Sequence, residues 1–157
     1  FRTGGKNVFS RKMDNKDYRV YTVLGDGECE EGQVWEALMF AAHKNLDNLV
    51  VIVDQNGLQI DGTVAEVGGI EPLDKKFEAF GFNTLKVDGH SFEELDKAFA
   101  VAKETKGMPT AILMKTVKGK GVSFMENQVG WHGKATNDEE YKQAMAELEA
   151  TLASLEG

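Results

Sequence analysis

The chain has 157 residues, enough for one domain around a single core, and its 41% hydrophobic content excludes a disordered chain. A formal net charge of −8 disfavours nucleic-acid and membrane partners. The single cysteine, Cys29, excludes an internal disulfide, and no apolar run approaches the roughly 20 residues that span a bilayer. We therefore expect a cytoplasmic protein.

The first half of the chain alternates apolar runs with an amphipathic segment. Residues 1–17 are polar and basic, and we interpret them as an atypical N-terminal segment that precedes one domain over residues 18–157. The pattern predicts a strand at 19–24 and a helix at 31–44. The continuous apolar run at 49–53 is typical of a parallel strand that is covered on both faces.

The second half continues this alternation after a glycine-containing loop. The pattern predicts a short helix over residues 72–81, a strand over 83–87 and a strand over 110–116. Between these strands, Ser91 opens a helix, and Glu94 three residues later predicts a capping box. Because strands alternate with helices, we predict an α/β fold, a parallel sheet with helices on both faces.

A glycine-rich loop over residues 118–133 leads to a last helix, which begins near Asn137. Three acidic residues in its first turn suit the positive end of the helix dipole. Apolar residues then recur at steps of four and three, which indicates a seam for a partner or for the domain's own surface. The seam consists of Tyr141, Met145, Leu148, Leu152 and Leu155.

Polar residues follow the first two predicted strands at the point where each strand ends. Asp26 lies between Gly25 and Gly27 after the first strand, and Asn56 follows the second strand by two residues. Carboxyl ends of adjacent parallel strands share one edge of a sheet, where ligands bind. A carboxylate, an amide oxygen and a backbone carbonyl suit Mg²⁺, and Gly27 permits close approach of a phosphate. The alternative is two ordinary turns, in which these residue types are common.

Three blocks of the sequence resemble one family. "GDGECEEGQVWEAL" and "VVIVDQNGLQIDG" resemble the thiamine-diphosphate fingerprint, and "DQNGLQIDG" is similar to the transketolase form of it. "KTVKGKGVSFMENQVGWHGKA" at 115–135 also resembles transketolase. The resemblance covers residues 16–157 and implies the diphosphate-binding domain of a thiamine-diphosphate enzyme, incomplete at its N-terminus.

The resemblance implies a metal and cofactor site at the two turns. Asp26 and Asn56 would supply side-chain oxygens to Mg²⁺, with Ca²⁺ as a substitute, and Leu58 would supply its backbone carbonyl. Gly27 and Asn56 would lie against the diphosphate of thiamine diphosphate.

The resemblance also assigns roles to three other residues. Lys118 and His132 would contact thiamine diphosphate, and His132 would act in catalysis by hydrogen bonding to a sugar oxygen near the reacting carbon. Glu31 would lie at a subunit interface. Taken without the resemblance, Lys118 reads as a solvated lysine, His132 as a packed or surface histidine, and Glu31 as a first-turn glutamate.

The implied function is that of a transketolase-type subunit or fragment, which transfers a two-carbon ketol unit from a ketose to an aldose among sugar phosphates. Its partner would be a pyrimidine-binding C-terminal transketolase subunit. The start of the chain, "FRTGGKNVFSR", departs from the family, so we expect exposed apolar surface and homo-oligomers. The alternative is a non-catalytic, truncated diphosphate-binding module. Another member of the thiamine-diphosphate superfamily is a third reading.

Overall fold

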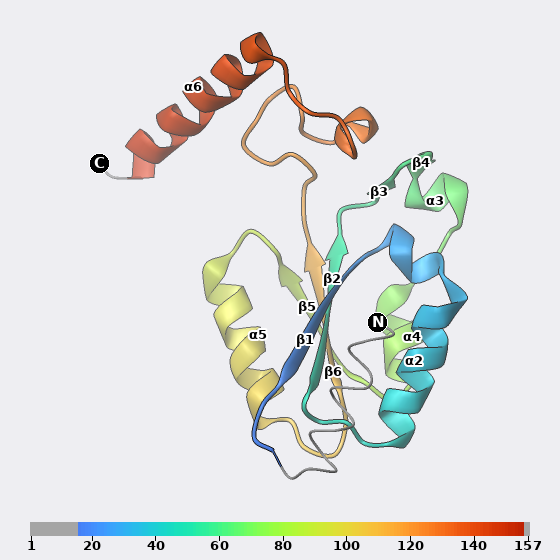
Figure 1. Ribbon diagram of the computed structural model, residues 1–157. Coiled ribbons are helices and arrows are strands. Elements are labelled where there is room, and N and C mark those ends of the chain that lie inside the picture. The colour runs from blue at the N-terminus through green and yellow to red at the C-terminus, as the bar shows by residue number, and fades with distance from the viewer. Residues whose placement is uncertain (1–15, 156–157) are drawn as a thin grey trace.

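A computed structural model describes residues 16–155 and shows a parallel, four-stranded sheet (Figure 1). Most of the predicted N-terminal segment therefore lies outside the described residues. Successive strand residues pair in parallel across the sheet, with Leu24 beside Val53 and Ile52 beside Ile112. The strands in spatial order are β1 (Val20–Gly25), β2 (Leu49–Gln55), β6 (Thr110–Lys115) and β5 (Asn83–Asp88).

Helices cover both faces of this sheet, as the sequence predicts. Helices α2 (Gly32–His43) and α4 (Leu73–Ala79) lie on one side, and α5 (Phe92–Glu104) lies on the other (Figure 1). Neighbouring residues of a strand point to opposite faces. Val51 of β2 therefore joins the core under α2 and α4, and Ile52 joins the core under α5.

The larger core is anchored by aromatic rings from both helices on its face. Phe77 of α4 is fully buried, and its ring centroid lies 5.7 Å from that of Trp35 of α2. Phe82, just before β5, meets Phe77 edge to face at 5.6 Å. These contacts fix α2 and α4 against each other and against the sheet.

Several short elements lie where the sequence predicts only loops. After β2 the chain forms a hairpin of β3 (Leu58–Gln59) and β4 (Gly62–Thr63), followed by helix α3 (Val64–Val67). Two 3-10 turns, η1 (Gly27–Glu30) and η2 (Val129–Trp131), complete the described elements. Strands of two residues are too short to show an alternating pattern, so no local signal marks this hairpin.

The predicted capping box at the start of α5 forms only in part. The Ser91 side chain accepts a hydrogen bond from the Glu94 amide at 3.2 Å, as expected. The Glu94 carboxylate, however, accepts from the amide of Asp88 at 2.7 Å, because the turn after β5 brings that donor within reach. A reciprocal box forms instead at the start of α3, between Thr63 and Glu66.

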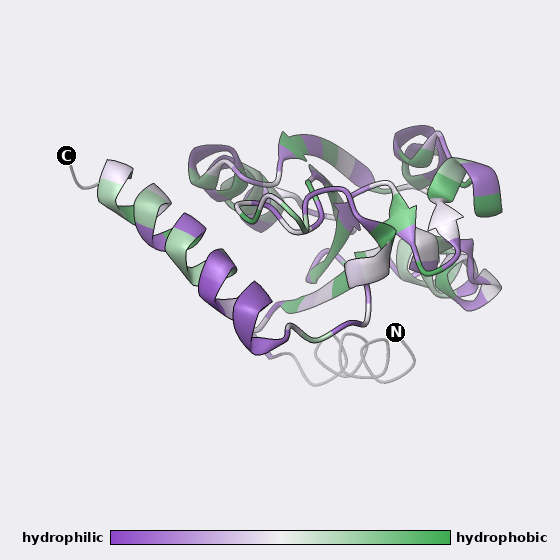
Figure 2. Ribbon diagram, turned by 90° about the horizontal axis from the view of Figure 1, so that it is seen from above, coloured by the Kyte–Doolittle hydropathy of each residue, from purple (hydrophilic) through white to green (hydrophobic). Residues whose placement is uncertain are grey.

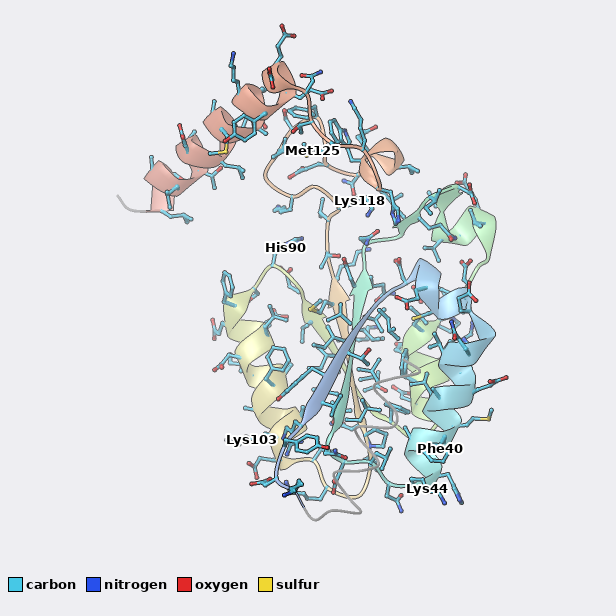
Figure 3. All side chains as sticks on the ribbon, viewed as in Figure 1. Phe40, Lys44, His90, Lys103, Lys118 and Met125 are labelled. Atoms are coloured by element: carbon cyan, nitrogen blue, oxygen red, sulfur yellow. The ribbon has the colours of Figure 1, made fainter. Side chains whose placement is uncertain are left out.

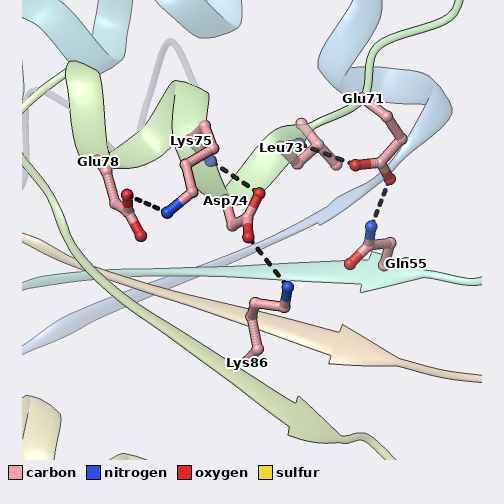
Figure 4. Close-up of polar contacts among 7 residues, drawn as sticks. All are labelled: Gln55, Glu71, Leu73, Asp74, Lys75, Glu78 and Lys86. Carbon is pink, nitrogen blue, oxygen red and sulfur yellow. Dashed lines mark hydrogen bonds and ion pairs between the residues drawn. The ribbon is translucent and has the colours of Figure 1, made fainter.

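Polar contacts tie α4 to the sheet (Figure 4). The Glu71 carboxylate accepts from the Leu73 amide at 2.8 Å and also from the side-chain amide of Gln55 at the end of β2. On the other side of the helix, Lys86 of β5 pairs with Asp74 at 2.9 Å. The start of α4 therefore lies beside the carboxyl end of β2.

The last helix, α6 (Asp138–Leu155), extends away from the sheet (Figures 1 and 2). Asn137 caps it by accepting from the amides of Glu139 and Glu140. The Glu147 carboxylate accepts from Ser123 in the preceding loop. The residues of the predicted seam remain 36–79% exposed: Tyr141, Met145, Leu148, Leu152 and Leu155.

Exposed apolar side chains also lie on β1, which pairs only with β2 among the described strands. Tyr21 is 52% exposed and Val23 is 64% exposed, and the Tyr21 ring meets Phe99 of α5 at 5.9 Å. This agrees with the expected exposed apolar surface. Within residues 16–155, no helix is both long enough and apolar enough to cross a lipid bilayer.

Removing the buried ring of Phe77 should strongly destabilise the folded protein. Phe77→Ala should lower the free energy of unfolding by about 3–5 kcal/mol, because a fully buried ring is replaced by a cavity. Urea denaturation measures this. Phe92→Ala is the matched control, since Phe92 is 89% exposed, and it should change stability by less than about 0.5 kcal/mol. Equal losses in the two variants would contradict this account of the core.

Candidate functional site

The side chain of Asp26 joins the turns that follow β1 and β2. Its Oδ2 accepts a hydrogen bond from the amide of Gly57 at 2.6 Å, and its Oδ1 accepts from the amide of Gly27 at 2.9 Å. Asp26 and Gly57 are 31 residues apart in the chain. The carboxylate is 2% exposed, so it is held between two backbone donors with almost no contact with water.

Parallel pairing of β1 with β2 brings these turns together. Gly25 lies beside Asp54 in the register, and the amide of Asp26 then donates to the carbonyl of Asp54 at 3.2 Å. Asn56 sits in the same turn as Gly57, and its side-chain oxygen accepts from the amide of Leu58 at 3.0 Å. The two turns are neighbours, as expected from the sequence, and their sharing of a metal ion stays a prediction.

Burial raises the pKa of Asp26 above its usual value, because the ionised carboxylate has lost its water. The hydrogen bonds from Gly57 and Gly27 act in the opposite direction, and the negative charge of Asp54 adds to the increase. A cation bound at this carboxylate would offset the cost of keeping it charged.

The oxygen atoms available as metal ligands at the two turns suit Mg²⁺. Within the part of the chain that the structure describes, no group of three or more His, Cys, Asp and Glu side chains gathers as a metal cluster. Asp26 instead offers one carboxylate, and the turn that donates to it through Gly57 also contains the side-chain oxygen of Asn56 and the backbone carbonyl of Leu58. Mg²⁺ commonly binds through one or two carboxylates, water and substrate phosphates, so a single carboxylate is sufficient here.

Packing explains the glycine at position 27, in addition to the predicted close approach of a phosphate. A Cβ atom at this position would lie 2.9 Å from the Cβ of Gln59, so the β3–β4 hairpin packs directly against the turn after β1. The side chain of Gln59 also donates to Glu30 at 3.1 Å. Sequence reasoning missed this contact, since it depends on a hairpin without a local signal.

Asp54 and Thr116 are further residues that the sequence analysis did not single out. The hydroxyl of Thr116 donates to the carboxylate of Asp54, and the amide of Thr116 donates to the carbonyl of Gln55 at 3.4 Å. The first residue after β6 is therefore tied to the end of β2. The signal for Asp54 was its position at the end of a buried apolar strand.

Lys118 follows β6 at the same edge of the sheet as the two turns. Figure 3 shows it at the end toward which the strands point, whereas Phe40, Lys44 and Lys103 lie at the opposite end. Lys118 is half-buried, and its carbonyl accepts from the amide of Asn127 at 3.0 Å, which closes the loop on itself.

His132 and Glu31 are both exposed. His132 follows η2 in the loop before α6, and its amide donates to the carbonyl of Val129 at 3.0 Å. Glu31 is the N-cap residue of α2 rather than a first-turn residue, and its side chain makes no capping hydrogen bond. Their assigned roles in catalysis and at a subunit interface stay predictions.

The fold and this edge define a class of protein. A parallel α/β sheet that gathers backbone amides and oxygen ligands at its carboxyl edge is typical of domains that bind phosphate-bearing ligands there. Residues 6–152 match the family described as "Transketolase, thiamine diphosphate binding domain". The chain belongs to this family.

Curated relatives of the chain include two bacterial proteins that are named as transketolase subunits. The chain is 44% identical to the 6-deoxy-6-sulfo-D-fructose transketolase subunit SqwG of Clostridium sp. (strain MSTE9), over 88% of this chain and 50% of that protein. It is 39% identical to one of the subunits of the apulose-4-phosphate transketolase of Phocaeicola vulgatus, over 95% of this chain and 53% of that protein. The chain thus spans about half the length of these relatives.

A solved structure shares the same fold. The transketolase of Campylobacter jejuni superimposes with a TM-score of 0.84 at 33% identity, covering 91% of this chain and 23% of that one. This match confirms the predicted α/β architecture and the predicted transketolase family.

The reactivity of Cys29 toward an alkylating reagent tests whether the turn after β1 is closed to solvent. Cys29 is fully buried, and burial, followed by the charges of Glu28 and Asp26, raises the pKa of its thiol from 9.0 to about 12. We expect iodoacetamide at pH 8 to leave the native protein unmodified and to add one group in urea, as measured by intact mass. Rapid labelling of the native protein would show that the turn is open.

Proposed function

We propose that this chain is the diphosphate-binding part of a transketolase, which binds thiamine diphosphate with Mg²⁺ and transfers a two-carbon ketol unit from a ketose to an aldose. The observation that supports this most strongly is the convergence of the turns after β1 and β2 on the buried carboxylate of Asp26. Membership of the transketolase family provides the cofactor class.

In this proposal the two turns hold the metal and the diphosphate. Asp26, Asn56 and the carbonyl of Leu58 coordinate Mg²⁺, with Ca²⁺ as a substitute, and the bound cation offsets the burial cost of the carboxylate. The backbone at Gly27 lies against the diphosphate, and the ammonium of Lys118 adds a positive charge near it.

The remaining residues act near the substrate and at the interface. Thiamine diphosphate, when bound, supplies the nucleophilic carbon that ketol transfer needs. His132 donates a hydrogen bond to a sugar oxygen near that carbon, which stabilises developing negative charge. Glu31, exposed at the start of α2, faces a second subunit.

A pyrimidine-binding subunit is the proposed partner. The two bacterial relatives are both named as transketolase subunits, which supports a split enzyme. Their names specify different sugars, so the proposal extends to ketoses as a class and no further. A homo-oligomer, a cytoplasmic location and the domain boundary at residue 17 also stay proposals.

A non-catalytic, self-associating module is the second candidate. The observation that favours it is the exposed apolar pair on β1, Tyr21 and Val23. Such a module would fold through the same core and would give no turnover with any partner chain.

Removing the charge of Asp26 should specifically weaken cofactor binding. Asp26→Asn keeps the shape of the side chain and removes its charge, so the affinity for thiamine diphosphate with Mg²⁺ should fall at least about 100-fold. Isothermal calorimetry measures this. Asp96→Asn, on an exposed part of α5, is the matched control and should bind as the native chain does. Equal binding by both variants would contradict the assignment of Asp26.

Mixing two chains separates the two candidate functions. With a pyrimidine-binding transketolase partner, thiamine diphosphate and Mg²⁺, we expect ketol transfer only in the mixture, followed with a ketose phosphate and an aldose acceptor. Each of the two chains should be inactive by itself, and Asp26→Asn should abolish turnover in the mixture. Cofactor binding without turnover in any mixture would instead support the non-catalytic module.

A further inference from the structure

The turn after β5 is held firmly at the edge of the sheet. The amide of His90 donates to the carboxylate of Asp88 at 2.8 Å, and the amide of Gly89 donates to the carbonyl of Lys115 at 2.8 Å. The amide of Asp88 donates to Glu94 in the first turn of α5. The backbone that carries the His90 ring is therefore fixed by both β6 and α5.

Close packing brings this turn against the beginning of the loop after β6. A Cβ atom on Gly89 would lie 2.5 Å from Cγ2 of Thr116 and 2.9 Å from Cβ of Met114. Only glycine allows this approach. The next side chain, that of His90, thereby reaches the loop that contains Lys118, and Figure 3 shows both residues at the same end of the sheet.

The His90 ring accepts one hydrogen bond from this loop. The amide of Val117 donates to Nε2 of His90 at 2.8 Å. Because a backbone amide can only donate, Nε2 must be the unprotonated nitrogen, and the proton of the neutral ring lies on Nδ1. The amide that makes this contact lies one residue before Lys118.

The start of the loop is thus held from two sides. Thr116 is bonded to Asp54 and Gln55 of β2, and Val117 is bonded to His90 beyond β5. The carbonyl of Asp54 also accepts from the amide of Asp26. Three hydrogen bonds, joined by the backbone from Thr116 to Val117 and by Asp54 itself, therefore link the turn after β5 to the candidate metal site.

We propose that His90 is a positioning residue, which fixes the first residues of the loop after β6 and so directs Lys118 toward the cofactor diphosphate. The role of Lys118 in this statement rests on the proposed function. The fixing of the loop rests on the contact between Val117 and His90 alone.

The experiment compares two variants of His90. His90→Phe keeps a planar ring and removes the acceptor, whereas His90→Gln places an amide oxygen near the position of Nε2. His43→Phe is the matched control, because His43 is exposed in the last turn of α2 at the opposite end of the sheet. Circular dichroism checks that all variants fold.

Amide hydrogen exchange, measured by NMR on the chain without cofactor, tests the fixing of the loop. His90→Phe should increase exchange at the amide of Val117, which donates to His90, and at the amide of Thr116, which donates to Gln55, at least about 3-fold, the scale of one lost hydrogen bond. His90→Gln should restore native exchange, and His43→Phe should leave it unchanged. Nitrogen shifts of His90 should show the Nδ1–H tautomer. Unchanged exchange in His90→Phe, or an Nε2–H tautomer, would overturn the proposal.

Calorimetry with thiamine diphosphate and Mg²⁺ tests the link to Lys118. His90→Phe should weaken binding about 3- to 10-fold, and His90→Gln should recover it. Native affinity in His90→Phe, or failure of His90→Gln to recover, would overturn the positioning role. If the native chain binds no cofactor, either alone or mixed with a pyrimidine-binding partner, the proposed function fails, and the exchange result at Thr116 then decides separately whether His90 fixes the loop.

Discussion

The candidate site depends on one buried carboxylate shared between two turns. Asp26 has almost no contact with water, and its oxygens are satisfied by amides from its own turn and from the turn after β2. The same contacts that fix the geometry of the turns also keep an unfavourable charge inside the protein. The shape and the electrostatics of this edge therefore cannot vary independently.

The order of the strands explains why polar groups accumulate at this edge. Strands β2 and β6 are central, so the residues that follow them meet in the middle of the sheet. Asp54 is the last residue but one of β2 and Thr116 follows β6, and their hydrogen bond joins the two ends. The apolar layers on both faces come from the same strands, so core packing sets the positions of the polar residues beyond it.

The sequence predicts the sheet and the meeting of the two turns, because the pattern of apolar runs determines successive parallel strands. It does not predict the β3–β4 hairpin, whose strands are too short for any periodicity. The predicted partner of Glu94 was wrong, since the Ser91 amide donates to the carbonyl of Asp88 and the Glu94 carboxylate accepts from the amide of Asp88 instead. The contact between His90 and Val117 requires β5 to lie beside β6, and no local pattern specifies that order.

The separation of Asp26 and Gly57 along the chain has a thermodynamic consequence. An isolated segment containing either turn lacks half of the arrangement, so a ligand of this edge binds the folded state and ignores the unfolded one. By mass action, such a ligand at 100 times its dissociation constant adds about 2.7 kcal/mol to the free energy of unfolding. A melting temperature that rises with ligand concentration would therefore report occupancy without any assay of turnover.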